Sequence, residues 1–190
     1  VSGLMMRFIR TKNTYADLYI SLIAAHTNLD QSPVYSGSAV LAELLHLQNV
    51  RQEGFIFLGD VPEGETTADK LRQCIAQVED EYIYLYGDAS KPIRTLAICG
   101  GAFDEGYLQA RQLGAQAYLT GEIRHHNAIA AVGSGFVLFG GGHFGTEAVL
   151  VPKLAGALQN ALNALQYYVY VYPSVYRPYG GRTDIEGGTT

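Results

Sequence analysis

The chain has 190 residues, 48% of them hydrophobic and 16% charged, which suits one domain with a sizeable core and excludes a disordered chain. A formal net charge of -5, with only 13 scattered lysines and arginines, excludes a large nucleic-acid-binding face. No apolar run approaches the roughly 20 residues of a membrane span, and Cys74 and Cys99 form no CxxC motif, so we expect core thiols in the reducing cytoplasm.

The first half of the chain alternates predicted strands and helices. Residues 18–25 (LYISLIAA) are apolar nearly throughout, as expected of a buried strand in an α/β sheet. Residues 35–47 place apolar side chains at helical spacing, and this predicted helix includes His46 as a partly buried residue. The other elements of this half are a strand over 55–58, a helix over 67–78 and a strand over 82–86.

The second half continues the alternation and closes on an aromatic strand. The predicted elements are a strand over 95–99, a helix over 104–113, a strand over 117–120, a helix over 123–132, a strand over 136–139, a helix over 145–165 bent near Pro152, and a strand over 167–172. This order predicts an α/β fold in which helices flank a layered, mixed sheet. We expect one domain over residues 1–173, incomplete at its N-terminus because the chain opens without Met, and a loosely ordered tail over 174–190.

Two pairs of histidine and carboxylate, each spaced by four residues, follow predicted strands. His26 and Asp30 follow the predicted strand over 18–25. His143 and Glu147 follow the predicted strand over 136–139 and the glycine run at 140–142. Ligands bind at the carboxyl ends of strands in open α/β sheets, and residues i and i+4 of a helix share one face. Two imidazoles and two carboxylates make a mixed nitrogen and oxygen ligand set for a divalent transition metal.

A purely structural interpretation of each pair stays open, because a histidine four residues from an acid is commonplace. The glycines before His143 favour the functional interpretation, since glycine lets a chain turn sharply or approach another group closely. A helix that begins at residue 143 directs its positive end toward a bound cation. Glu147 would then offset the helix dipole as well as bind the ion.

A third polar segment, TGEIRHH, follows the predicted strand over 117–120. Glu122, His125 and His126 are candidates for an acid/base group or a further ligand, because imidazoles titrate near neutrality. Helix capping explains the same segment, since Thr120 before an acidic first turn is an ordinary start of a helix. The sequence leaves both interpretations open.

The last predicted strand, YYVYVY, carries tyrosines on both faces. Tyr168, Tyr170 and Tyr172 share one face, and Tyr167 shares the other with two valines. Aromatic side chains on both faces suit a subunit interface, and packing within the chain explains them equally well.

Four segments together resemble the NIF-three-like family, whose members include the type 2 homologues of GTP cyclohydrolase I. The segments are AAHTNLD (24–30), CGGAFDEGYLQA (99–110), AYLTGEIRHH (117–126) and GHFGTE (142–147). The resemblance implies an α/β protein that assembles into a toroidal homohexamer with a dinuclear metal centre in each subunit. It also implies that His26, Asp30, His143 and Glu147 are metal ligands.

The family pattern includes a His-His pair upstream of the segment that resembles residues 3–10, and this chain has no such pair. Two metals with at least four positions each are poorly served by four side chains. We therefore expect an impaired or mononuclear site for zinc, iron or manganese, with one ion rather than two in each subunit, unless His125 or His126 substitutes as a ligand.

Three functions are compatible with these residues. The first is metal-dependent hydrolysis of an unknown small-molecule substrate, with Glu122 or His125 as general acid or base. The second is a non-catalytic metal chaperone, store or regulator within a ring assembly. The third is a scaffold that binds no metal. We expect self-association, and neither nucleic acid nor membrane as a partner.

Overall fold

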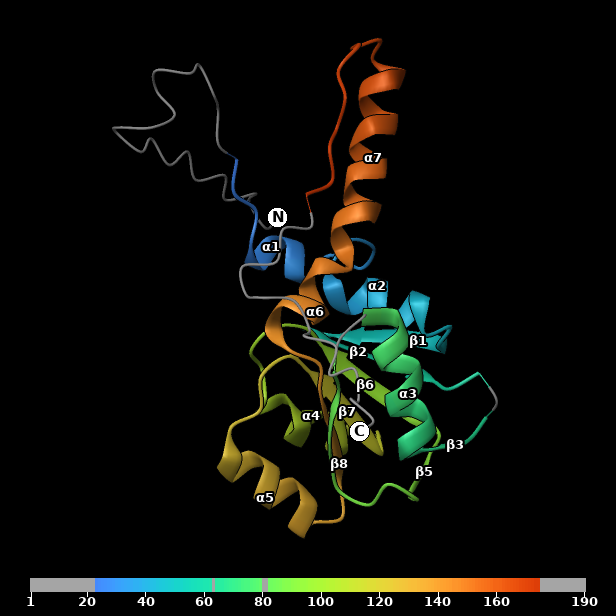
Figure 1. The fold of residues 1–190 in the computed structure, drawn as a ribbon, viewed down its shortest axis with the longest axis vertical. Helices are drawn as coiled ribbons and strands as arrows, with labels where there is room; N and C mark the ends of the chain where they lie inside the picture. Colours follow the sequence, from blue (N-terminus) through green and yellow to red (C-terminus); the bar gives the residue numbers. More distant parts are fainter. Residues whose placement is uncertain (1–22, 63, 80–81, 175–190) are drawn as a thin grey trace, which may run out of the picture.

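The computed structural model describes residues 23–62, 64–79 and 82–174, and a six-stranded mixed sheet lies at its centre (Figure 1). The strands are β1 (Gln48–Glu53), β2 (Ile56–Asp60), β4 (Tyr84–Tyr86), β6 (Thr95–Cys99), β7 (Ala117–Thr120) and β8 (Val137–Gly140). Their order in the sheet is β1-β2-β6-β7-β8-β4. The three central strands β6, β7 and β8 run parallel, and the flanking pairs are antiparallel. The carboxyl ends of the three central strands therefore meet at one edge of the sheet.

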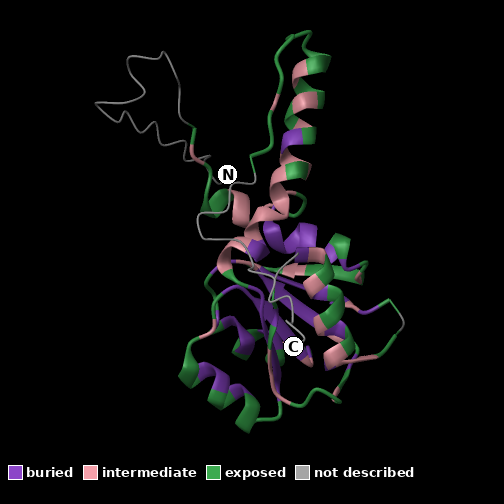
Figure 2. Cartoon of the chain, viewed as in Figure 1, coloured by how far each residue is buried: buried purple, intermediate pink, exposed green. Residues whose placement is uncertain are grey.

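Helices cover both faces of this sheet, because its central strands direct apolar side chains to each of the two faces. Leu96 and Ile98 of β6 pack in one core with α2 (Gly37–Leu44) and α3 (Ala68–Glu79). Ala97 and Cys99 pack on the other face with α4 (Gly106–Gln112) and α5 (His125–Gly133). Figure 2 shows the buried strands between these two layers. The layered, mixed α/β sheet predicted from the sequence is confirmed.

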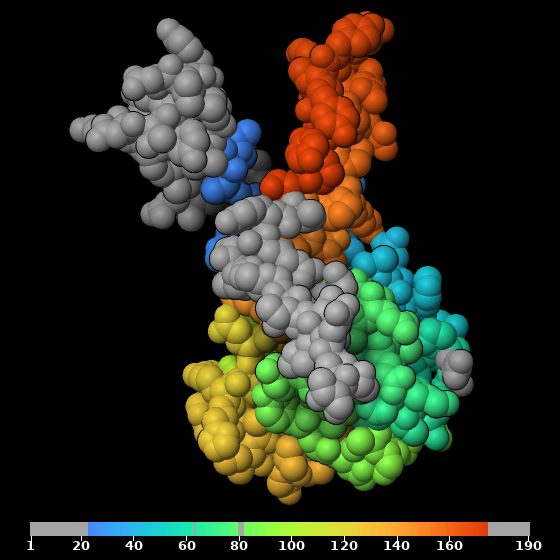
Figure 3. Space-filling view, in the orientation of Figure 1, coloured from blue at the N-terminus to red at the C-terminus, as the bar shows by residue number. Residues whose placement is uncertain are grey.

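The last two helices lead away from this layered body. α6 (His143–Ala148) begins after the glycine run, and α7 (Leu150–Ala164) projects from the sheet (Figure 1). Residues 165–174 return alongside α7, as the space-filling view shows (Figure 3). The remaining elements are α1 (Thr27–Asp30) and a small antiparallel sheet of β3 (Thr66–Thr67) and β5 (Pro92–Ile93). Among the described residues, no helix has both the length and the apolar character needed to cross a bilayer.

Several predicted elements have different bounds in the structure. The strand predicted over residues 18–25 lies largely outside the described residues, and of its described part Ala24 forms an isolated bridge. The predicted helix over 35–47 ends at Leu44, because His46 has a φ of 54° that no helix allows. His46 is therefore an exposed residue after the helix, and its prediction as a partly buried helix residue is wrong. The sequence pattern does not indicate strand β1, because most of its side chains are exposed and polar.

The predicted long helix over 145–165 begins earlier and divides at Val149 rather than at Pro152. Pro152 lies in the first turn of α7, where a missing N–H breaks no helical hydrogen bond.

The predicted strand over 167–172 is wrong, since this segment belongs to no β-ladder within the described residues. The Gln159 side chain binds it instead: its Nε2 donates to the Val169 carbonyl (2.9 Å), and the Val171 N–H donates to its Oε1 (2.9 Å).

Candidate functional site

The candidate site is built on the three loops that follow β6, β7 and β8. Gly101 and Glu122 lie on the first two loops, and His143 begins α6 at the end of the third, all at the edge of the sheet where the parallel strands end. This edge is the ligand-binding position of open α/β sheets. Loops from three different parts of the chain therefore meet because the strands that carry them are neighbours.

Backbone hydrogen bonds join these loops directly. The N–H groups of Gly121 and Glu122 both donate to the Gly101 carbonyl, at 2.9 and 3.1 Å. The Gly142 N–H donates to the Gly121 carbonyl at 3.0 Å. A Cβ on Gly121 would lie only 2.6 Å from the Gly101 oxygen and 2.8 Å from the His143 Cα, so the loops approach closer than any side chain allows. Glycine is required here for close approach.

The glycine run before His143 sets the direction of α6. Gly142 has a φ of 77°, a left-handed conformation that lets the chain reverse off β8 and start the helix at His143. Thr146, which is fully buried, holds the first turn: its hydroxyl accepts from the Gly101 N–H (3.0 Å) and donates to the Gly142 carbonyl (2.9 Å). These contacts tie α6 to the loop that follows β6.

The His143 imidazole lies between two carboxylates. Its Nδ1 is 2.6 Å from Glu122 Oε1, and its Nε2 is 3.2 Å from Glu147 Oε1. The hydrogen bond to Glu122 is the largest effect on the pKa of His143 and raises it. Burial opposes this rise, and the negative charge of Glu147 adds to it. All three side chains are partly exposed, which keeps the imidazole accessible to a ligand.

Asp30 belongs to the same neighbourhood although it is distant in sequence. Burial raises the pKa of the Asp30 carboxyl, and the charges of His26 and His143 partly offset that effect. Asp30 and Glu147 line one cavity of about 20 Å³, whose wall includes Cys99. A cavity of about 10–15 Å³ already holds one water molecule, so this one suits a single small ion or water.

The four predicted ligands are thus brought together unequally. His143 and Glu147 are in contact, Asp30 shares a cavity with Glu147, and His26 is an exposed residue that acts on Asp30 through its charge. Within residues 23–62, 64–79 and 82–174, no three His, Cys, Asp or Glu side chains converge closely enough to hold an ion between them. The donor types and the small cavity fit a divalent metal, and the side chains form pairs rather than a closed coordination sphere.

The two other predicted catalytic residues differ in position. Glu122 contacts His143 directly. His125 is the exposed first residue of α5, and no described residue makes a side-chain hydrogen bond or ion pair with it. The structure therefore connects Glu122, and not His125, to the His143 and Glu147 pair.

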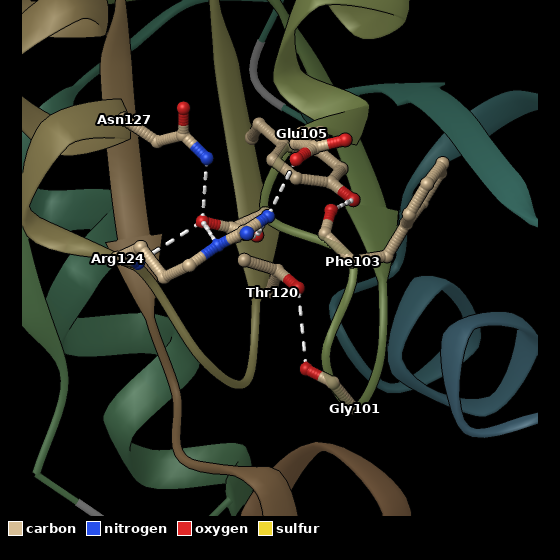
Figure 4. Close-up of polar contacts among 8 residues, drawn as sticks. Gly101, Phe103, Glu105, Thr120, Arg124 and Asn127 are labelled. Carbon is tan, nitrogen blue, oxygen red and sulfur yellow. Dashed lines mark hydrogen bonds and ion pairs between the residues drawn. The ribbon is translucent and has the colours of Figure 1, made fainter.

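A buried network that the sequence did not single out supports the loop after β7 (Figure 4). Asp104 is 6% exposed. Its carboxylate accepts hydrogen bonds from the Arg124 backbone N–H (3.0 Å), from the Arg124 guanidinium (2.8 Å) and from Asn127 Nδ2 (2.6 Å). The Tyr118 hydroxyl donates to the Phe103 carbonyl at 2.7 Å in the same cluster. Both segments, AFDEG and GEIRHHN, carry polar residues beside glycine, but spacing alone does not pair residues 104 and 124.

The ion pair between Asp104 and Arg124 shifts the pKa values of both groups. Hydrogen bonds from Arg124 hold the pKa of the Asp104 carboxyl far below its usual value, and they raise the pKa of Arg124. On the same sheet face, burial raises the pKa of the Cys99 thiol to about 11, so Cys99 stays a neutral core residue as predicted. Cys74 is exposed on α3, and its prediction as a core thiol is wrong.

Two further cavities lie in the described part of the chain. One of about 270 Å³ adjoins the site, because Glu147 lines it together with Phe144, Leu150 and Val151. A larger one of about 490 Å³ lies against α2 and α3 and includes none of the predicted site residues. Of these two cavities, the smaller one is the candidate binding cavity, because it is lined by Glu147 of the site and the larger one by no site residue.

The fold and this loop cluster define a class: an α/β protein whose mixed sheet presents histidine and carboxylates at the carboxyl ends of neighbouring parallel strands. Residues 10–177 match the Duf34/NIF3 (NGG1p interacting factor 3) family, and the chain belongs to that family. The resemblance stated from the four sequence segments is confirmed.

Relatives in this family are similar over most of the chain. A GTP cyclohydrolase 1 type 2 homolog from Streptococcus pneumoniae is 29% identical over 174 residues, which cover 84% of this chain and 64% of that protein. A protein of the same name from Pseudomonas aeruginosa is 33% identical over 147 residues, which cover 73% of this chain and 57% of that protein. The chain thus spans less than two thirds of the length of either relative.

Solved structures show the same fold. Staphylococcus aureus protein SA1388 superposes with a TM-score of 0.78 at 21% identity, over 95% of this chain and 76% of that one. A Bacillus cereus protein related to NIF3 superposes with a TM-score of 0.78 at 17% identity, over 86% and 73% of the two chains.

Replacing Gly121 by alanine should destabilise the site. The added Cβ would meet three backbone atoms within 3 Å, and overpacking against backbone costs about 1–3 kcal/mol. Urea unfolding checks this, with Gly133→Ala as the control, since Gly133 has open space around it and alanine favours its helix. An equal free energy of unfolding for wild type and Gly121→Ala would contradict the close approach of the loops.

Replacing Asp104 by asparagine should remove a pH-dependent part of the stability. Because the carboxyl pKa is lowered in the folded state, the stabilisation is present above the unfolded pKa of about 3.9 and is lost as the pH falls through the folded value. We expect Asp104→Asn to lower the free energy of unfolding by about 1–3 kcal/mol at pH 7. The difference from wild type should shrink below about pH 4. Glu53→Gln, at an exposed position, is the matched control for the loss of one carboxylate.

Proposed function

We propose that the chain binds one divalent transition metal at the edge of the sheet, through His143 and Glu147 together with Asp30 and His26. The observation that supports it best is the cavity of about 20 Å³ shared by Asp30 and Glu147, beside the His143 imidazole. Two neutral imidazoles and two carboxylates would balance the charge of one dication. Burial raises the pKa of Asp30, and a cation in the cavity would favour the ionised form of this carboxyl.

The proposed activity is metal-dependent hydrolysis of a small molecule. A divalent ion held there would supply a more acidic water and a Lewis acid for a carbonyl or phosphoryl oxygen. The chain itself offers the adjoining cavity of about 270 Å³, where Phe144, Leu150 and Val151 form an apolar wall next to Glu147. That wall would hold and orient an apolar part of the substrate and would exclude water from it. The name of the relatives, GTP cyclohydrolase 1 type 2 homolog, is no guide to the substrate here, because this chain spans only part of them.

Metal content provides the first test. We expect about one zinc, iron or manganese ion for each chain after purification and dialysis, measured by inductively coupled plasma mass spectrometry. Glu147→Ala should lose most of that metal, because it removes a donor that lines the small cavity and contacts His143. Glu53→Ala, an exposed carboxylate on β1, is the matched control and should keep it. Two ions in each wild-type chain would contradict the mononuclear proposal.

Turnover separates hydrolysis from plain metal storage or delivery. We would assay esters, phosphoesters and nucleotides with metal-loaded wild type and Glu147→Ala. Activity that survives Glu147→Ala unchanged would contradict the hydrolase. Metal binding without any turnover would favour a chaperone or regulator.

Self-association through the projecting arm, residues 150–174, is part of the same proposal. Residues 154–174 contain no charged side chain, and several of their apolar residues are exposed, up to 100% for Tyr168. Gln159 occupies the backbone groups of Val169 and Val171, which alternate with those of Tyr168, Tyr170 and Tyr172. The arm thus presents an edge of backbone N–H and C=O groups, those of the three tyrosines, to which Gln159 does not bind. A second copy would pair with this edge, and no like charges would repel it. The ring-shaped hexamer implied by the family resemblance is one assembly that this contact would serve.

The arm proposal is tested by mass in solution. We expect light scattering coupled to gel filtration to give a multiple of the 20.6 kDa chain for wild type. Tyr168→Lys combined with Tyr170→Lys should lower that mass, because it places like charges opposite one another in the contact. Ile129→Lys, at an exposed apolar position on α5, should leave it unchanged. A monomeric wild type would contradict the proposal.

A further inference from the structure

We infer that Glu122 is a positioning residue: it accepts the Nδ1 proton of His143, fixes the tautomer and the ring plane of the imidazole, and so presents Nε2 as the bare ligating nitrogen. The inference concerns this carboxylate and the ring, and its consequence for metal affinity rests on the proposed function.

The two ring nitrogens of His143 contact different carboxylates at different distances. Glu122 Oε1 lies 2.6 Å from His143 Nδ1, a distance typical of a strong hydrogen bond to a charged group. On the opposite side of the ring, Nε2 lies 3.2 Å from Glu147 Oε1. A neutral imidazole has one N–H, and the nearer carboxylate, that of Glu122, is the better acceptor for it. In the neutral ring the proton then stays on Nδ1, and Nε2 is the nitrogen nearer to Glu147, a residue that lines the small cavity.

Glu122 differs from an ordinary surface carboxylate because its backbone is already fixed. Exposed ion pairs contribute little when two long side chains must be ordered to form them. Here the Glu122 N–H donates to the Gly101 carbonyl at 3.1 Å, and Gly121 before it is held between two loops. Arg124, just beyond, is anchored by buried Asp104. The backbone at His143 is held by the hydrogen bonds of Gly142 and Thr146, so only side-chain rotations remain to be ordered when the two groups meet.

The same arrangement reassigns Glu122. The sequence suggested it as a general acid or base, whereas its contact in the structure is with a ring nitrogen that points away from Glu147. A carboxylate that orients a ligating histidine from behind typically changes metal affinity by about 10–100-fold when it is removed. Glu122 acts through His143 rather than on the substrate.

The first experiment measures the tautomer without metal. Protein labelled with ¹⁵N-histidine, stripped with a chelator and held at a pH where the imidazoles are neutral, gives the protonated nitrogen of His143 from long-range ¹H–¹⁵N spectra. Wild type should show the Nδ1–H form, and Glu122→Ala should shift the ring toward Nε2–H. Glu122→Gln should retain Nδ1–H, because its amide oxygen still accepts. An unchanged tautomer in Glu122→Ala would overturn the inference.

The second experiment measures zinc affinity by competition with a chromophoric chelator. Glu122→Ala should weaken binding about 10–100-fold, Glu122→Gln should weaken it less, and Glu53→Ala should leave it unchanged. Equal affinity of wild type and Glu122→Ala would count against the positioning role. If wild type binds none of zinc, iron and manganese, the proposed function fails, and the tautomer comparison still decides the inference about Glu122.

Discussion

The contact on which the site depends is the set of backbone hydrogen bonds between the loops that follow β6, β7 and β8. Parallel strands bring their carboxyl ends to one edge, and the Gly101 carbonyl then accepts from two N–H groups of the next loop. Side chains would hold these loops apart, so glycine stands at the points of closest approach. His143 and Glu122 meet because their backbones are already joined. The polar chemistry of the site is therefore a consequence of backbone packing.

Much of the fold was predictable because both faces of the central strands are buried. Apolar runs bounded by glycine gave β6 and β7 their bounds without error, and helical spacing gave α3 within one residue at each end. Motif order identified the family, which a periodicity argument alone would not have done. The pairs at His26 and His143 were also visible, since a histidine and an acid four residues apart follow an apolar run in each case.

The remaining features depend on contacts between distant residues, which a single sequence does not show. The partner of Arg124 is Asp104 and the partner of His143 is Glu122, and neither pair has a spacing that marks it. Strand β1 lacks alternation because it is an exposed edge. The YYVYVY segment has every local property of a strand, but β-structure also needs a neighbouring strand, and here a side chain from α7 occupies its backbone groups instead.

Helix α1 gives the site two parts of unequal rigidity. It is four residues long and buries none of them, whereas His143 stands on a helix bound to the core by fully buried Thr146. Segments with little burial open at a small fraction of the global unfolding free energy. His26 and Asp30 can thus swing outward while the sheet stays intact, and amide exchange would be fast there and slow beneath His143. Because Asp30 is the residue of α1 that lines the small cavity, local opening of α1 would remove part of the cavity wall without unfolding the sheet.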